Sequence, residues 1–174
     1  CVEKKSFNNN NKSDLELRTT AHLMPAVIFL NKIGVWKHLE SHSCPLNSLN
    51  IINSRDINNN PLKISENTFE SKEIGKDCFG YNVPLEKSIK ILRELVISKE
   101  NAELLEDTSL ISSSLDGEFR IAQLSNGEVI KTKLIIGADG SNSVVRDLSD
   151  ISTFERDTRQ TALTFNAKHE IKHF

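Results

Sequence analysis

Apolar positions recur at a helical spacing in two segments of the chain. In residues 23–33 they fall at Leu23, Val27, Leu30 and Ile33. Proline is tolerated only in the first turn of a helix, so Pro25 places the start of this helix near Met24, and Gly34 is expected to end it. The sequence "VWKHLES" then predicts a short second helical piece. Residues 85–96 follow a proline and predict an amphipathic helix, with apolar residues at Leu85, Ile89, Leu92 and Val96.

Shorter apolar stretches separated by turn-forming residues predict antiparallel strands. Residues 46–54 and 62–70 flank "DINNNP" and are expected to pair as a hairpin. Residues 103–115, 118–124 and 128–136 are separated by Asp-Gly and Asn-Gly, which are strong hairpin signals. We therefore expect a small antiparallel meander whose last strand, "KLIIGADG", enters the core. Residues 75–82 contain two glycines and are expected to form a loop.

Composition narrows the class of protein without identifying it. The chain has 174 residues, enough for one medium domain or part of a larger one. Its net charge of −2 lacks the basic surplus that is typical of a nucleic-acid-binding domain. Its cysteines lie far apart, at Cys1, Cys44 and Cys78. That spacing favours a reducing compartment and argues against a disulfide framework or a zinc site. No apolar run approaches the ~18 residues of a membrane span.

The histidines and the first residue each lead to one further expectation. The five histidines show no metal-ligand pattern and are interpreted as surface residues: His22, His38, His42, His169 and His173.

The chain begins at Cys1 rather than at methionine, and "CVEKK" has the pattern of the end of a strand. We therefore expect the chain to be an internal fragment of a longer protein.

The residues that could form a ligand-binding site are concentrated in residues 134–148, "LIIGADGSNSVVRDL". Ligands of open α/β sheets bind beyond the carboxyl ends of strands, and the glycines here would allow a ligand to approach closely. Asp139 could accept a hydrogen bond from a ribose or polyol hydroxyl, or it could simply cap the following helix. Ser141 or Asn142 could also cap that helix, whose N-terminus would favour an anion such as phosphate. Arg146 could pair with Asp139 or another carboxylate, or reach a phosphate.

The stretch "GADGSNSVVR" resembles the Asp-Gly motif of the single-component FAD-dependent aromatic hydroxylases. In that family the motif lies between the two outer flavin fingerprints. Its aspartate contacts the flavin side of the site, and the motif is also implicated in handling the nicotinamide cofactor. The resemblance implies that cofactor-binding residues are Gly137, Ala138, Asp139, Gly140, Ser143 and Arg146.

Other segments are similar to the same family. "VEK" resembles the end of the second Rossmann strand, where an acidic residue binds the adenosine ribose, and this implies that role for Glu3. Residues 17–36, "LRTTAHLMPAVIFLNKIGVW", are similar to a segment of the ubiquinone-biosynthesis hydroxylase branch, in which Arg18 matches an arginine near the flavin. His22 departs from the leucine usual there. "QTALTFNAKHEIKHF", residues 160–174, resembles the first strand of the substrate-domain sheet.

This resemblance implies a fold class and a domain organisation. The fold would be α/β, an incomplete FAD/NAD(P)-binding Rossmann-like domain with parts of a β-rich substrate domain. Residues 46–70 and 160–174 would be those parts, threaded through an FAD-binding monooxygenase domain that spans the chain. No Ser-His-Asp or Cys-His arrangement is suggested by the spacing, and catalytic residues stay unassigned. This fits a flavoprotein, because the cofactor carries out the oxygen chemistry while the protein binds, orients and excludes water.

The implied activity is hydroxylation of the aromatic ring of a polyprenylated ubiquinone precursor with FAD, NAD(P)H and O2. The implied partners are a prenylated phenol and O2, with no nucleic acid. Peripheral membrane association or assembly with other ubiquinone-biosynthesis enzymes is also implied. The implied location is cytoplasmic, at the inner membrane of a bacterium, or on the matrix side of the mitochondrion in a eukaryote.

Two parts of the family pattern are missing from the sequence. A Gly-rich phosphate loop is expected before Cys1, and a Gly-Asp motif that holds the ribityl chain is expected after Phe174. The isolated chain is therefore expected to be inactive. Two other interpretations stay open. The parent could be a related flavoprotein such as an epoxidase or a prenyl-lipid reductase, or the chain could be a non-catalytic gene remnant.

Overall fold

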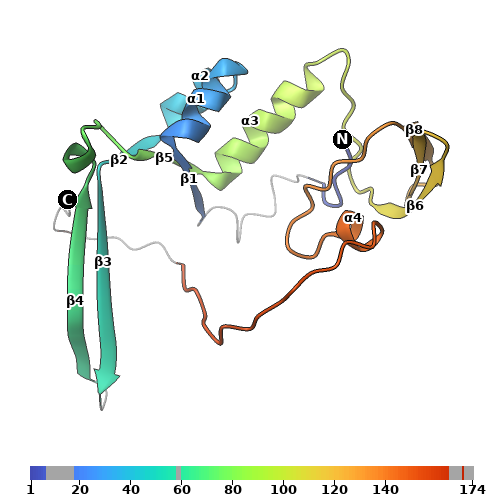
Figure 1. Ribbon diagram of the computed structural model, residues 1–174. Coiled ribbons are helices and arrows are strands. Elements are labelled where there is room, and N and C mark those ends of the chain that lie inside the picture. The colour runs from blue at the N-terminus through green and yellow to red at the C-terminus, as the bar shows by residue number, and fades with distance from the viewer. Residues whose placement is uncertain (7–17, 58–59, 165–169, 171–174) are drawn as a thin grey trace. The chain divides into compact units, whose positions relative to one another are not determined.

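The computed structural model describes residues 1–6, 18–57, 60–164 and 170. The chain divides into two compact units (Figure 1). One consists of Cys1–Asn10 and Leu95–Leu163, and the other of Asn11–Glu94 and Thr164–Phe174. Among the described residues, all named strands pair antiparallel, and the one parallel pairing is an isolated bridge between Val2 and Leu105.

The unit that contains Asn11–Glu94 is built on a three-stranded sheet in the order β1-β5-β2. Its strands are β1 (Thr19–Leu23), β5 (Gly80–Pro84) and β2 (Cys44–Leu46). The central strand corrects the expectation of a loop over residues 75–82. At Gly80 an added Cβ would lie 2.2 Å from the carbonyl oxygen of His22, so the glycine allows two strands to approach closely. A glycine taken for a loop signal is therefore a close-packing position within a strand.

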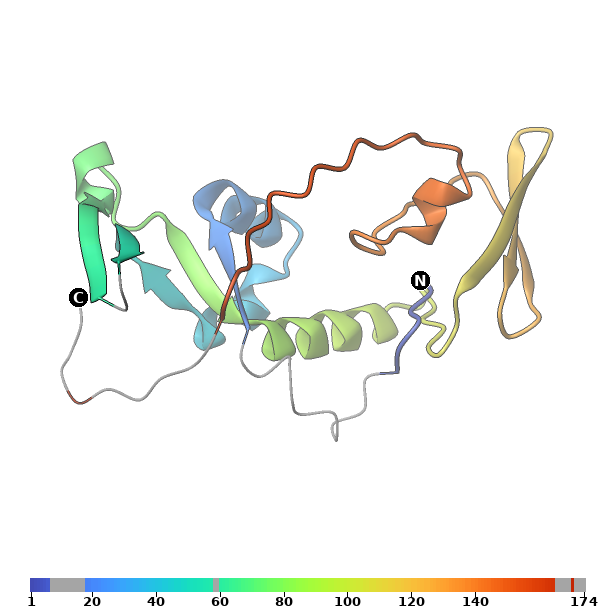
Figure 2. The same cartoon turned by 90° about the horizontal axis from the view of Figure 1, so that it is seen from below.

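The helices of this unit agree with the hydrophobic spacing. They are α1 (Met24–Lys32), α2 (Trp36–Leu39), the 3-10 turns η1 (Glu40–His42) and η2 (Ser71–Ile74), and α3 (Leu85–Ile97), which directly follows β5 (Figure 2). Pro25 lies in the first turn of α1, and Gly34 follows its end with a φ of 75°. The core is small and consists of Val27, Trp36, Leu39 and Val83, the last with 0% exposure.

A long hairpin also belongs to this unit, as expected for residues 46–70. It is formed by β3 (Ser48–Ile57) and β4 (Asn60–Glu70), with a register shift between Asn53 and Ser54. Figure 1 shows it as a two-stranded ribbon. Its large apolar side chains are exposed: Leu49, Ile51, Ile52, Leu62, Ile64 and Phe69. The assignment of residues 46–70 and 160–174 to a substrate-domain sheet stays a prediction. Residues 160–164 form neither helix nor strand, and residues 165–169 and 171–174 lie outside the described part.

The other unit contains the predicted meander, in the order β6-β7-β8. Its strands are β6 (Leu110–Asp116), β7 (Phe119–Leu124) and β8 (Val129–Thr132), joined at the two expected turns. The expectation that the last strand continues to residue 136 is wrong. Pairing with β7 ends at Thr132, and the next residues have no partner strand among those described, so Leu134 and Ile136 are 70% and 78% exposed. A short helix, α4 (Val144–Asp147), follows this segment.

Candidate functional site

The loop before α4 is organised around the Asp139 carboxylate. Its Oδ2 accepts hydrogen bonds from the backbone N–H groups of Val144 (2.7 Å) and Val145 (3.2 Å). Its Oδ1 accepts a hydrogen bond from the Ser143 hydroxyl at 2.5 Å. Asp139 therefore closes the loop onto the first turn of α4, which is the capping role that the sequence left open beside a ligand role.

Ser143 is the N-cap of α4, rather than Ser141 or Asn142 as expected from the sequence. Its buried hydroxyl accepts the N–H of Arg146 at 3.1 Å while donating to Asp139. The three-residue spacing from Ser143 to Arg146 is that of an N-cap and the third helical position, and it could have identified the cap. Because Asp139 and Ser143 already occupy these N–H groups, this four-residue helix does not offer them to a phosphate.

The hydrogen bonds also set the ionisation of Asp139. The Ser143 hydroxyl, followed by the backbone N–H groups around it, holds the pKa of the Asp139 carboxyl below its ordinary value, although partial desolvation opposes the shift. Two carboxylate oxygens offer about four acceptor positions. Three of them are used within the loop, so Asp139 can accept about one more hydrogen bond from a ligand hydroxyl.

The two glycines of the motif serve different purposes. An added Cβ at Gly137 would lie 2.9 Å from the Cβ of Val145, so this glycine lets the loop pack on α4. Gly140 has a φ of 86°, a backbone conformation that other residues rarely adopt, and nothing lies within 4 Å of an added Cβ. Ala138 is exposed between them. The open side of this loop, at residues 138–140, is therefore where a ligand could approach the backbone.

Arg146 points back to the loop rather than to Asp139. Its guanidinium donates to the Ser141 carbonyl at 2.9 Å. Its Nε lies 3.5 Å from the Asp147 carboxylate without making a hydrogen bond, and is shielded from solvent. Of the alternatives that the sequence left open, pairing with another carboxylate is the one seen. Contact with a cofactor stays a prediction for this residue.

Glu3 follows an isolated parallel bridge between Val2 and Leu105, and the described residues 1–6 contain no strand. Its backbone N–H donates to the Leu105 carbonyl at 2.8 Å, and its own carbonyl accepts from Thr108 at 3.1 Å. Among the described residues, its exposed carboxylate accepts only the N–H of Lys5, at 3.1 Å. Acceptor positions for ribose hydroxyls therefore remain open, and the ribose role stays a prediction.

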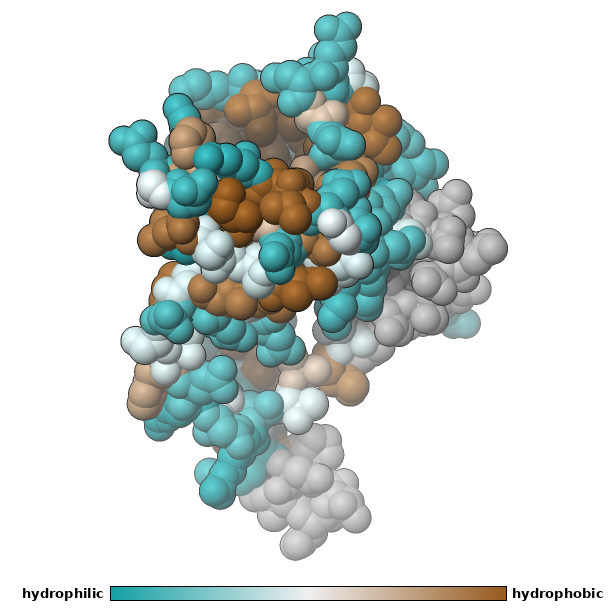
Figure 3. Space-filling view, turned by 90° about the vertical axis from the view of Figure 1, so that its right-hand side faces the viewer, coloured by the Kyte–Doolittle hydropathy of each residue, from teal (hydrophilic) through white to brown (hydrophobic). Residues whose placement is uncertain are grey.

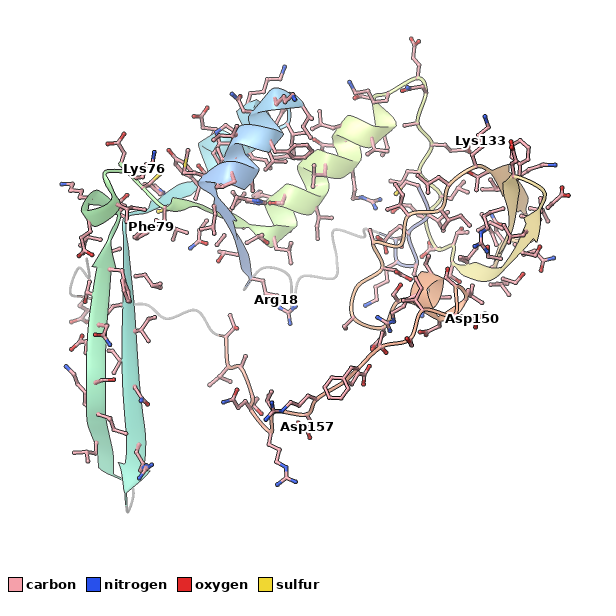
Figure 4. All side chains as sticks on the ribbon, viewed as in Figure 1. Arg18, Lys76, Phe79, Lys133, Asp150 and Asp157 are labelled. Carbon is pink, nitrogen blue, oxygen red and sulfur yellow. The ribbon has the colours of Figure 1, made fainter. Side chains whose placement is uncertain are left out.

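Arg18 belongs to the other unit, so the structure does not place it relative to Glu3 or Asp139. Its carbonyl accepts the N–H of Leu85 at 2.9 Å, which anchors the start of β1 to the start of α3. Its exposed side chain extends away from β1 (Figure 4). A role near the flavin is still a prediction for Arg18.

One histidine differs from its sequence interpretation. His22 is half-buried because β1 pairs with β5 and places it opposite Tyr81, and its shielded Nε2 has no hydrogen-bond partner among the described residues. His38 and His42 lie within the described residues, and His169 and His173 lie outside them.

Within the described ranges, no three His, Cys, Asp or Glu residues gather in a way that could hold a metal ion. The part of the chain covered by the structure also contains no helix long and apolar enough to cross a membrane.

The residues present fit part of an FAD site. Free acceptor positions on the Glu3 and Asp139 carboxylates suit ribose or ribityl hydroxyls, and the Gly140 backbone is accessible. The 174 residues contain no Gly-x-Gly-x-x-Gly, the loop whose N–H groups would hold the pyrophosphate. The chain therefore presents acceptor groups that suit cofactor hydroxyls and does not contain the glycine-rich phosphate loop.

The known proteins similar to this chain are longer than the chain. No protein-family model matches the chain. It is 25% identical over 159 residues to the 3-demethoxyubiquinol 3-hydroxylase of Escherichia coli K12, covering 91% of this chain and 39% of that protein. It is 30% identical over 145 residues to the ubiquinone biosynthesis monooxygenase COQ6, mitochondrial, of Caenorhabditis elegans, covering 79% and 30%. The chain thus spans less than half the length of these curated relatives.

Solved structures with the same fold include two flavin enzymes. PqsL of Pseudomonas aeruginosa, a probable FAD-dependent monooxygenase, superposes with a TM-score of 0.55 at 19% identity, over 90% of this chain and 40% of its own. The flavin-dependent monooxygenase PieE, solved with FAD and substrate, superposes with a TM-score of 0.64 at 15% identity, over 85% and 27%. The predicted fold class and resemblance are confirmed: this chain has a partial α/β fold of the FAD-dependent monooxygenases and is similar over most of its length to ubiquinone hydroxylases.

Proposed function

We propose that this chain forms part of an FAD-dependent monooxygenase that hydroxylates the aromatic ring of a polyprenylated ubiquinone precursor with NAD(P)H and O2. The observation that carries the proposal is similarity to a 3-demethoxyubiquinol 3-hydroxylase and to a ubiquinone biosynthesis monooxygenase, over 91% and 79% of the chain. The similarity includes the motif of residues 137–146, whose hydrogen bonds are described above.

The residues of this chain would bind and position the cofactor. Bound FAD, reduced by NAD(P)H, would supply the oxygen chemistry. The Glu3 carboxylate would accept hydrogen bonds from the adenosine ribose. Asp139 would contribute its remaining acceptor position to a cofactor hydroxyl while its other contacts keep the loop closed on α4. Arg18 and Arg146 would add positive charge near the cofactor.

The proposed substrate has a phenolic ring and a long apolar tail. Burying the tail would contribute ~0.8 kcal/mol per CH₂, so binding would not need a cationic partner for a substrate carboxylate. Such a substrate resides in a membrane, and we place the enzyme at a membrane surface as a peripheral protein. In a bacterium this would be the inner membrane, and in a eukaryote the matrix side of the mitochondrion.

Deletion of the gene in its own organism tests this function. We expect quinone synthesis to stop and an under-hydroxylated prenylphenol to accumulate in lipid extracts analysed by mass spectrometry. Unchanged quinone content in a strain without a second hydroxylase of this type would contradict the proposal.

The cofactor role of Asp139 needs a comparison that separates it from capping. In the enzyme that contains this chain, Asp139→Ala removes both the cap and the carboxylate, whereas Ser143→Ala weakens the cap and leaves the carboxylate. We expect Asp139→Ala to lower the flavin content of the purified enzyme well below that of Ser143→Ala, with His22→Ala near the unmodified protein. Equal flavin loss in Asp139→Ala and Ser143→Ala would show that Asp139 acts only as a cap.

A further inference from the structure

The β6-β7-β8 meander carries an arginine on its inner face. Strand pairing aligns Arg120 with Leu115 and Thr132 on the face that also contains Ala122 and Leu124. Ala122 and Leu124 are 6% and 4% exposed, which identifies this face as the buried side of the sheet. Arg120 itself is half-buried there. An arginine is unusual at such a position unless its guanidinium has a partner.

The cation on the opposite face of the same sheet is fully partnered. Lys131 lies 2.8 Å from the Asp116 carboxylate and 4.7 Å from the centre of the Phe119 ring. Within the part of the chain that the structure describes, the side chains of Arg120 and Lys133 have no hydrogen bond or ion pair. Figure 4 shows Lys133 just after β8. Among the described residues, the outer-face Lys131 therefore has an anionic partner, whereas Arg120 on the inner face and Lys133, exposed just after β8, have none.

These two cations border a cavity of about 180 Å³ within the same unit. Arg120 and Lys133 supply its charge, and the apolar residues that line it are Leu110, Leu134, Ile135, Val145 and Leu148. Leu134 is 70% exposed at its edge, so the cavity opens to solvent. Figure 3 shows apolar and hydrophilic surface side by side on the face of the molecule that includes this unit. Charge and apolar surface thus meet within one small concavity.

We propose that this cavity binds a small amphiphilic carboxylate, with the carboxylate at Arg120 and Lys133 and a short apolar body against the leucines. A guanidinium presents paired donors that match a carboxylate, and the lysine adds a second charge. The cavity is smaller than the roughly 300–1,000 Å³ of pockets for drug-sized ligands, so the ligand is a short acyl chain and not a long-tailed lipid. The cavity shares Val145 with the loop around Asp139, because the Val145 side chain lines the cavity and its N–H donates to Asp139. The inference does not rest on the proposed hydroxylase function.

Titration of the purified protein with octanoate tests the site. Octanol has the apolar body without the charge, and inorganic phosphate has the charge without the apolar body. We expect saturable calorimetric binding of octanoate that exceeds binding of either control. Arg120→Gln should weaken it about tenfold, which corresponds to ~1.4 kcal/mol, while Lys131→Gln on the outer face should leave it unchanged. Absence of saturable octanoate binding, or equal affinity in Arg120→Gln, would overturn the proposal.

Thermal unfolding provides a readout that a structural role would not reproduce. An unpaired guanidinium on a buried face lowers stability, so without ligand Arg120→Gln should unfold at the same or a higher temperature than the unmodified protein. Octanoate should raise the unfolding temperature of the unmodified protein and not that of the variant. A lower unfolding temperature of Arg120→Gln together with no effect of octanoate on either protein would show that Arg120 is structural and would refute the site.

Discussion

Replacement of Ser143 by alanine tests how the loop of residues 137–146 is held. The hydroxyl both accepts the Arg146 N–H and donates to Asp139, so the substitution removes two contacts at one helix start. Loss of an N-cap typically costs ~1 kcal/mol. If the region opens locally, that cost corresponds to about fivefold faster exchange of its protected amide hydrogens. We also expect the pKa of Asp139 to rise towards its ordinary value, because Ser143 is the largest cause of its lowering.

Amide hydrogen exchange by NMR measures this at the N–H groups of Val145 and Arg146. Ser141→Ala is the matched control, since Ser141 contributes only its backbone carbonyl, to Arg146. We expect faster exchange in Ser143→Ala and unchanged exchange in Ser141→Ala. Equal exchange rates in the two variants would refute the assignment of Ser143 as the cap, and an unchanged Asp139 pKa would refute its electrostatic role.

Three further predictions concern pH, the core and the cofactor. Because folding lowers the pKa of Asp139, the ionised carboxylate stabilises the fold above the ordinary aspartate pKa, and this stabilisation is lost as the pH falls below about 4. Denaturation measured over a pH series should show this loss of unfolding free energy. In Asp139→Asn the part of the loss that comes from this carboxylate should be absent. Leu39 is 1% exposed, so Leu39→Ala should lower the free energy of unfolding by about 2–5 kcal/mol in urea titrations, against less than about 0.5 kcal/mol for the exposed Ile28→Ala. The 174-residue polypeptide expressed alone should show no stoichiometric flavin absorbance, because it lacks the glycine-rich phosphate loop.

Local periodicity was sufficient to predict the helices and hairpins. Proline and glycine bracket α1, and Asp-Gly and Asn-Gly join the strands of the meander, so these elements depend on short-range rules. Strand pairing at long range could not be predicted in the same way. Gly80 has the local signature of a loop residue, and its role in β5 depends on the close approach of a strand almost sixty residues earlier.

Local pattern also over-predicted one strand. Residues 133–136 have the composition of a buried strand, but a strand requires a neighbour to satisfy its backbone groups. Among the described residues none pairs with this segment, and Leu134 and Ile136 are largely exposed. Composition reports which residues favour a strand and cannot report whether a partner strand is present.

The candidate site shows the same division between local and long-range information. The short motif identified Asp139, Ser143 and Arg146 as a group, and the structure brings them together through hydrogen bonds. The motif could not tell capping from ligand binding, because both roles use the same carboxylate. Arg120 was missed entirely, since its position on the inner face is visible only once the register of β6, β7 and β8 is known.

The proposed activity of the enzyme that contains this chain is hydroxylation of a prenylated phenol. The most direct measurement incubates the purified enzyme that contains this chain with FAD, NAD(P)H, a prenylated phenol and isotope-labelled O2, and analyses the product by mass spectrometry. A monooxygenase places one oxygen atom of O2 in the new ring hydroxyl and reduces the other to water. We expect a product that carries one labelled oxygen. A hydroxyl that carries oxygen from solvent water, or consumption of NAD(P)H without any ring product, would contradict the account.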